Sequence, residues 1–202
     1  MNELPIDALV NKNNLLSSDY YPKDLIITDQ NENNFHEFQD PRLKPMVSKV
    51  IWPYMEKMFD DAKKAGFVLA VDSGYRSYNY QQKVLDKLIE EVGDVAYQKV
   101  ALPGASEHQT GLAFDYGYYR DDKFYSSDYV REEDPEAIWM KENSYKYGFI
   151  LRYPKGKEEI TGFQYEPWHF RFVGLKLAQE LFNEGVTLDE YYARKENGTL
   201  KR

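Results

Sequence analysis

The chain has 202 residues, of which 42% are hydrophobic, 16% aromatic and 30% charged, so it can fold around a packed core without covalent staples. Its net charge is −8 and it contains no basic run of five or more residues, which argues against a nucleic-acid partner. It has no cysteine, which excludes disulfides, thiolate nucleophiles and cysteine-ligated zinc sites.

No apolar stretch approaches the roughly 18 residues that a membrane-spanning helix needs, and no signal-peptide apolar region follows Met1. We therefore expect either a cytoplasmic protein or a cell-envelope or extracellular protein whose anchor has been trimmed. We also expect a monomer, because nothing in the sequence indicates a partner chain.

Internal repeats, low-complexity blocks and Gly/Ser linkers are absent, so residues 1–202 are predicted to form a single domain. Residues 1–40 are rich in Asn and Asp and should form an irregular N-terminal arm of loops. His36 lies in this arm, where we expect a surface position.

The next segments combine a helical and a strand pattern. Apolar residues recur at helical spacing over 41–65, which predicts a helix kinked near Pro53 and stopped by Gly66. The run FVLAV at 67–71 predicts a buried strand, and the pair at 73–74 predicts the turn after it.

The remaining patterns mix strands and helices without a βαβ rhythm. Strands are predicted at 111–116, 149–153 and 168–173, and an acidic, tyrosine-rich loop at 118–133. Helices are predicted at 80–92, 135–147 and 175–183, with a last one starting at Thr187, which can form a capping box with Glu190. This order predicts an α+β fold.

Two of the three histidines lie in segments crowded with other reactive groups, and the first of these is SEHQTGLAFD at 106–115. If a strand starts at Gly111, then Gly111, Ala113 and Asp115 share one face and the residues between them face the core. The small side chains then leave room for a metal ion between His108, on the preceding loop, and the carboxylate of Asp115.

The second segment is EPWHFR at 166–171. In a regular strand Glu166 and His169 would face opposite sides, but Pro167 favours a bulge or a strand start that turns both to one side. His169 and Arg171 would then share a face.

Two imidazoles and one carboxylate suit zinc, and three protein ligands leave a fourth position for water. A spare glutamate beside such a site can act as the base that a metal-activated water needs. The alternative is that each histidine is an ordinary buried or surface residue. Two histidines flanked by Asp and Glu on segments with alternating small residues favour the metal site.

A third segment, SGYRSYNYQ at 73–81, follows the predicted buried strand and opens a helix. Arg76 could bind a carboxylate through two hydrogen bonds or stabilise an oxyanion. The alternatives are an ordinary salt bridge for Arg76 and a helix N-cap for Ser77.

These segments together resemble the family of zinc D-alanyl-D-alanine carboxypeptidases that includes the VanY, VanXY and LdcB types, peptidase family M15B. The resemblance covers about four fifths of the sequence, and the N-terminal anchor of wall-bound members is missing from it. Four motifs carry it in the family's order, namely SGYRSYNYQ at 73–81, SEHQTGLAFD at 106–115, YGFILRYP at 147–154 and EPWHFRFVG at 166–174.

The resemblance implies the fold shared with the Hedgehog signalling domain, in which helices flank a small central antiparallel sheet. It implies one Zn²⁺ ion held by His108, Asp115 and His169. Glu166 would act as general base and acid, and Arg76 would contact the substrate or its oxyanion. The other residues expected to bind substrate are Ser106, Gln81, Ser73, Tyr78 and Trp168.

The function implied is removal of the C-terminal D-alanine from peptidoglycan stem peptides or precursors, by D,D- or L,D-cleavage. The alternatives are a D,D-dipeptidase, a dual dipeptidase/carboxypeptidase of the VanXY type, and a non-catalytic zinc-bearing binding domain. An endolysin would need a wall-binding module, for which too few residues follow Gly174. A dipeptidase must bury the free ammonium of its substrate beside an anion. The position before Gly74 is the neutral Ser73, and strand alternation predicts that Asp72 points away, which favours the carboxypeptidase.

Overall fold

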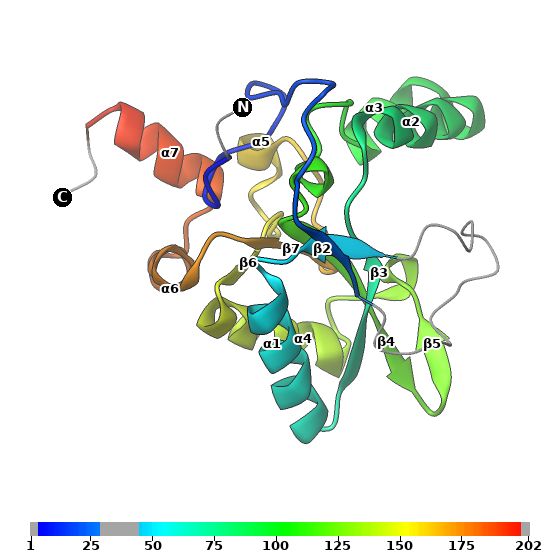
Figure 1. Cartoon of the computed structure of the whole chain (residues 1–202), viewed down its shortest axis with the longest axis vertical. Helices are drawn as coiled ribbons and strands as arrows, with labels where there is room; N and C mark the ends of the chain where they lie inside the picture. The colour runs from blue at the N-terminus through cyan, green and yellow to red at the C-terminus, as the bar shows by residue number, and fades with distance from the viewer. Residues whose placement is uncertain (1–3, 29–44, 199–202) are drawn as a thin grey trace.

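The computed structural model describes residues 4–28 and 45–198, and its centre is an antiparallel sheet of five strands (Figure 1). The strand order is β3-β4-β7-β6, and β5 pairs with the outer end of β4. The strands are β3 (Val68–Ser73), β4 (Ala113–Arg120), β5 (Lys123–Tyr125), β6 (Phe149–Leu151) and β7 (His169–Phe172). The α+β prediction is therefore confirmed.

Helices surround this sheet. In Figure 1 helices α1 and α4 lie below the sheet, α2 and α3 above it, and α6 and α7 to its left. Within the described residues no helix is both long enough and apolar enough to span a membrane. The α-helices are α1 (Trp52–Lys64), α2 (Tyr78–Val92), α3 (Ala96–Lys99), α4 (Pro135–Asn143), α5 (Glu158–Thr161), α6 (Leu175–Glu184) and α7 (Leu188–Glu196). In the described part of the chain four 3₁₀ helices accompany them, namely η1 (Gly93–Val95), η2 (Glu107–Thr110), η3 (Ser127–Tyr129) and η4 (Ser144–Tyr147).

The main hydrophobic core lies between one face of the sheet and α1. Phe114 of β4 is fully buried and packs edge-on against Phe149 of β6, with ring centroids 5.4 Å apart. It also stacks on Phe170 of β7 and packs against Phe59 of α1. Because strand side chains alternate, this apolar face leaves the opposite face of β4 and β7 free to carry polar groups.

The predicted helix over 41–65 is wrong in its first part. Residues Met46–Ser48 form strand β2, which pairs with β1 (Leu25–Ile27), and α1 begins only at Trp52. Pro53 therefore lies in the first turn of α1, where its missing N–H costs nothing, and it does not kink the helix. The expected arm of loops likewise contains β1. His36 lies outside the described residues.

The predicted loop over 118–133 is also wrong. Strand β4 continues to Arg120 and turns back into β5 through Asp121 and Asp122. Both aspartates have positive φ, 51° and 58°, as the two central residues of a tight hairpin turn require. An Asp-Asp pair is a weaker turn signal than Asn-Gly or Asp-Gly, and the acidic composition of the segment is typical of a loop, so the sequence did not predict the hairpin.

The other predicted elements occur with small shifts at their ends. Helix α2 starts two residues earlier than predicted, and Ser77 caps it by accepting a hydrogen bond from the Tyr80 N–H at 3.2 Å. The predicted helix over 135–147 is α4 followed by the 3₁₀ helix η4, and it stops at Gly148 as expected.

The capping box predicted for the last helix is present. The hydroxyl of Thr187 accepts from the Glu190 N–H at 3.1 Å, and the Glu190 carboxylate accepts from the Thr187 N–H at 2.7 Å. Thr187→Ala should therefore lower the free energy of unfolding by about 1 kcal/mol, because one backbone donor loses its partner. Urea denaturation will measure this as a lower midpoint at unchanged slope. Thr187→Ser keeps the hydroxyl and should retain most of the stability, and equal midpoints for all three proteins would contradict the role of the cap.

Candidate active site

Asp115 and His169 lie directly opposite each other on the polar face of the paired strands β4 and β7. The Nδ1 atom of His169 lies 2.8 Å from Oδ1 of Asp115. Ala113 pairs with Arg171 two residues away and shares this face, while the intervening Phe114 is in the core. The predicted alternation along both segments is confirmed, except that Gly111 precedes the strand.

His108 reaches the same point from η2, which ends where Gly111 adopts the left-handed conformation at φ 68°. A side chain at Gly111 would also crowd Leu25, because its Cβ would lie 3.0 Å from that side chain. The Nε2 atom of His108 lies 3.3 Å from Oδ2 of Asp115, and its ring is 4.9 Å from that of His169. The structure thus brings the three residues together from a short helix and two strands.

The backbone carbonyl of Gly74 orients the ring of His108. Its carbonyl oxygen lies 2.6 Å from Nδ1 of His108. Gly74 itself packs on the backbone of β2, since a Cβ there would lie 2.2 Å from the Met46 carbonyl oxygen. The Tyr75 N–H donates to that same oxygen at 2.6 Å. Only glycine fits this contact, so strand β2 helps to set the position of the imidazole.

The donor atoms of these three residues fit a metal ion. They lie within 4.8 Å of one another, and ligands in tetrahedral geometry about zinc are roughly 3.4 Å apart. Burial, aided by the charge of Arg76, lowers the pKa of His108 to about 4, so its ring is neutral. With the ring proton donated from Nδ1 to Gly74, the buried Nε2 has no hydrogen-bond partner among the described residues and directs a lone pair at Asp115. A cation between these two acceptors would relieve their repulsion.

The second histidine is held by acidic groups. Burial alone would lower the pKa of His169, but the hydrogen bond to Asp115 and the carboxylates of Glu107 and Glu166 outweigh it and raise the pKa to about 9. Burial likewise opposes ionisation of Asp115, yet His108 and His169 hold its pKa well below the usual range. Asp115 therefore supplies a fixed negative charge between the two histidines, as a cation site requires.

Glu166 stands beside this cluster, directly before β7. Its Oε2 lies 3.8 Å from Nδ1 of His169, and the strand start at His169, as predicted, turns both residues to one side. Burial raises the pKa of Glu166 to about 7, with a further rise from Asp115 opposed by His169. A carboxyl group with this pKa can take up and release a proton near neutral pH.

Arg76 and Gln81 complete the rim from the start of α2. The Nη2 atom of Arg76 lies 3.9 Å from Oδ2 of Asp115, and its buried Nε has no hydrogen-bond partner among the described residues. Gln81 is buried and donates from Nε2 to the Ala101 carbonyl at 2.8 Å, leaving its Oε1 without a partner in the described structure. Both groups offer polar atoms to a ligand.

Two cavities meet at Arg76. The smaller, about 60 Å³, contains the two clustered histidines and Glu166 and is also lined by Ser106 and Gln81. Sequence reasoning missed six of its lining residues, namely Lys99, Val100, Ala101, Glu107, Tyr153 and Phe163. Of these, Glu107 and Tyr153 lie in motifs that carry the family resemblance, whereas no pattern marks the other four.

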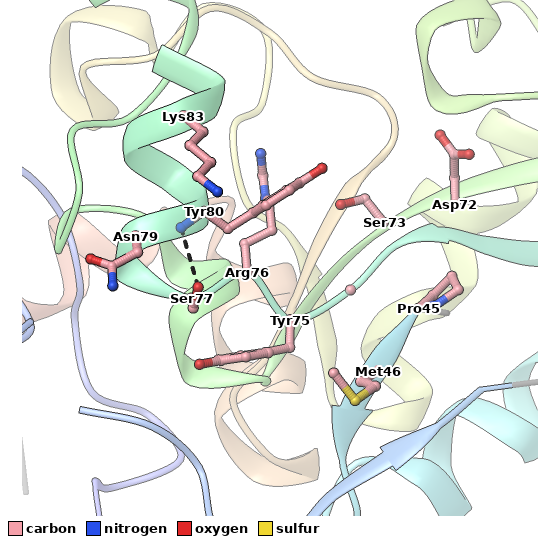
Figure 2. Close-up of a pocket in the computed structure, with 11 residues that line it drawn as sticks. Pro45, Met46, Asp72, Ser73, Tyr75, Arg76, Ser77, Asn79, Tyr80 and Lys83 are labelled. Atoms are coloured by element: carbon pink, nitrogen blue, oxygen red, sulfur yellow. Dashed lines mark hydrogen bonds between the residues drawn. The ribbon is translucent and has the colours of Figure 1, made fainter. Parts of the chain in front are cut away.

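The larger cavity, about 270 Å³, is also lined by Arg76. Figure 2 shows Arg76, Tyr80 and Ser73 directed into this space, with Lys83 above it and the ring of Tyr75 below. Of the residues expected to bind substrate, Tyr78 and Trp168 line neither cavity; Trp168 packs against the main core instead.

The simple alternation expected for Asp72 is wrong. The pairing of β3 with β4 shifts register between Val71 and Ser73, so Asp72 is an extra, bulged residue and lines the same cavity as Ser73. Its carboxylate accepts hydrogen bonds from the N–H and the hydroxyl of Ser127, at 2.9 and 2.5 Å. Figure 2 shows it at the edge of the cavity, apart from Arg76.

Known proteins of similar sequence cover nearly the whole chain. The model of the family VanY, described as D-alanyl-D-alanine carboxypeptidase, matches residues 44–175. The protein YodJ of Bacillus subtilis (strain 168) is 42% identical over 193 residues, which are 93% of this chain and 67% of that protein. The bifunctional D-Ala-D-Ala dipeptidase and carboxypeptidase VanXYC of Enterococcus gallinarum is 36% identical, covering 91% of this chain and 92% of its own length.

Solved structures agree with this likeness. The LD-carboxypeptidase LdcB matches with a TM-score of 0.81 and 42% identity, over 93% of this chain and 86% of that one. A D,D-pentapeptidase VanY, solved in complex with Zn(II), matches with a TM-score of 0.76 and 32% identity, over 92% and 98% of the two chains. The chain belongs to the VanY family of D-alanyl-D-alanine carboxypeptidases.

Proposed function

We propose that this protein is a zinc carboxypeptidase that removes the C-terminal D-alanine from peptidoglycan stem peptides or their precursors. One observation carries the proposal: His108 and His169 of the buried cluster with Asp115 line a cavity together with the additional carboxyl group of Glu166. A VanY structure with bound Zn(II) supports the choice of metal.

The three ligands have distinct roles in this proposal. His108 offers the lone pair of Nε2, His169 offers Nδ1, and Asp115 supplies the charge that balances the cation. When bound, zinc acts as a Lewis acid and lowers the pKa of a coordinated water towards about 7. Three protein ligands leave a position for that water, as catalytic zinc sites do.

Glu166 is the proton carrier. Its pKa near 7 lets it accept the proton of the attacking water and return it to the leaving amine. Arg76, which lines both cavities, stabilises negative charge on the scissile carbonyl oxygen. A binding module without catalysis has no need of a free carboxyl group at this position.

Each of the two cavities binds a different part of the substrate. The small cavity suits the terminal D-alanine, with the unpartnered Gln81 oxygen and the Ser106 hydroxyl as polar contacts and the cation of Lys99 at its wall for the terminal carboxylate. The larger cavity, which Arg76 also lines, receives the preceding part of the stem peptide. A substrate of this kind places the reaction at the cell wall or its precursors.

A dual dipeptidase/carboxypeptidase activity is the second candidate. One observation favours it: the carboxylate of Asp72 lines the larger cavity, where it could face a free ammonium group. Its hydrogen bonds to Ser127 weaken this alternative, because the ammonium would have to compete for a carboxylate that is already held.

The first test concerns the metal. The purified protein should contain about one zinc ion, and both His108→Ala and His169→Ala should lose it, because three ligands are the minimum for such a site. Elemental analysis after dialysis will measure the content. The matched control is His36→Ala, the same change at the third histidine, which should keep its zinc. Full occupancy in the His108 and His169 variants would rule out this ligand set.

The second test separates metal binding from chemistry. Glu166→Gln should keep zinc and substrate affinity, while kcat falls by roughly 100- to 10,000-fold, the usual contribution of a general base. Steady-state kinetics and zinc analysis on the same preparation will show both. If activity stays within a few-fold of wild type, another group is the base, and if zinc is lost, Glu166 is a ligand.

The third test concerns substrate length. Stem peptides should be hydrolysed clearly and free D-Ala-D-Ala weakly, because a buried ammonium needs an anion, and the cavity presents neutral Ser73 and an already hydrogen-bonded Asp72. Mass spectrometry of penta- and tetrapeptide muropeptides, with a chelator control, will also distinguish D,D- from L,D-cleavage. Comparable kcat/KM on the free dipeptide would favour the dual activity instead.

A further inference from the structure

Glu107 is a buried carboxylate beside the metal-binding cluster to which the proposed mechanism gives no role. It precedes His108 on η2, and only 1% of its surface is exposed. Its Oε1 accepts hydrogen bonds from two equally buried arginines, from Nε of Arg152 at 2.7 Å and from Nη1 of Arg171 at 3.0 Å. Burying several charged groups costs free energy of folding unless they pair with one another or with a neighbouring group.

The other oxygen of Glu107 faces a metal-ligand candidate. Its Oε2 lies 3.5 Å from Nε2 of His169, on the side of the ring opposite the Nδ1 atom that faces Asp115. Neither Oε2 nor Nε2 has a hydrogen-bond partner elsewhere in the described residues, and both are buried. A buried imidazole N–H and a buried carboxylate oxygen that face each other without other partners are expected to form a hydrogen bond.

The arginines fix this carboxylate in position, because both donate hydrogen bonds to its Oε1 atom. Arg152 also pairs with Asp189 of α7 at 2.6 Å, so that two cations and two carboxylates balance within the cluster. Arg171 donates in addition to the Ile6 and Ala8 carbonyls of the N-terminal arm. The two arginines that hold the carboxylate are thus themselves fixed, Arg152 by α7 and Arg171 by the N-terminal arm.

We propose that Glu107 is a positioning residue for the metal site: its carboxylate accepts the Nε2–H of His169, so that the lone pair of Nδ1 is directed toward Asp115 and the metal. This inference rests on the proposed zinc site. Metal-binding histidines usually donate their second ring N–H to such an acceptor, which fixes both the tautomer and the ring orientation. Glu107 accepts the second ring N–H of His169 in this way, as the Gly74 carbonyl accepts that of His108.

The most informative variant is Glu107→Gln, because it keeps the shape of the side chain and replaces one acceptor oxygen with an NH₂ donor. The two arginines can only donate, so they will claim the single amide oxygen and turn the NH₂ group toward Nε2 of His169. Nε2 must then accept, and the ring proton moves to Nδ1, where it obstructs the metal. Zinc affinity, measured by competition with a chromophoric chelator, should fall by about 10- to 100-fold.

The matched control is Asp189→Asn. It makes the same change of charge and chemistry in the same buried cluster, but Asp189 bonds to Arg152 and Asn11 and does not contact His169. Both variants should melt at a lower temperature than wild type in the metal-free form, whereas only Glu107→Gln should lose the larger part of its zinc affinity. Equal losses of zinc affinity in the two variants would overturn the proposal and leave Glu107 a purely structural residue.

A measurement on the unaltered protein decides the question even if Glu107→Gln does not fold. The chain has three histidines, so long-range ¹H–¹⁵N spectra of the zinc-loaded protein can resolve each ring. The proposal requires that His169 carries its proton on Nε2, in slow exchange with water, and coordinates through Nδ1. A proton on Nδ1 would refute it. Failure of the wild-type protein to bind zinc would instead contradict the proposed function.

Discussion

The antiparallel register of β4 with β7 is the constraint on which the site depends. It places Asp115 directly opposite His169, with their side chains on the same face and 2.8 Å between Oδ1 and Nδ1. A slip of β7 by one residue would turn His169 into the core and bring Phe170 to the polar face beside Asp115. The register is held because these phenylalanines pack with Phe149 under α1. The apolar face of the sheet thereby determines the position of the polar face.

Burial gives the polar face its chemistry. Removed from water, the groups change their affinity for protons according to their neighbours, so that His108 is neutral, Asp115 is ionised and Glu166 has a pKa near 7. Two neighbouring acidic side chains whose pKa values differ this much can take different roles, one holding a cation and the other moving a proton. The cost of the enclosed charge is offset by arginines: Arg152 pairs with Glu107, and Arg76 approaches Asp115.

Distant parts of the chain meet at this centre. Strand β2 packs against Gly74 and so fixes the position of the carbonyl group that orients His108. The N-terminal arm and α7 reach the other side through Arg171 and Arg152, which converge on Glu107. The proposed peptidase site is therefore a property of the whole packed chain, although its candidate ligands occupy two short segments. Proton transfer and metal binding both rely on this support, because small displacements of ligands are costly to such sites.

Much of this could be predicted from the sequence by itself. The alternation of small and large residues around Asp115, the proline before His169 and the scarcity of histidine point to one pair of segments, and most helices and strands follow from local periodicity and caps. Local patterns failed where pairing between strands decided the outcome, as in β2, in the β4–β5 hairpin and at the bulge of Asp72. Only the tertiary structure could place Glu107 behind His169 and assign its arginine partners, which lie 45 and 64 residues away in the sequence. A sequence pattern can predict which face of its own helix or strand a side chain lies on. The role of a buried charged group depends instead on the groups that long-range packing brings into contact with it.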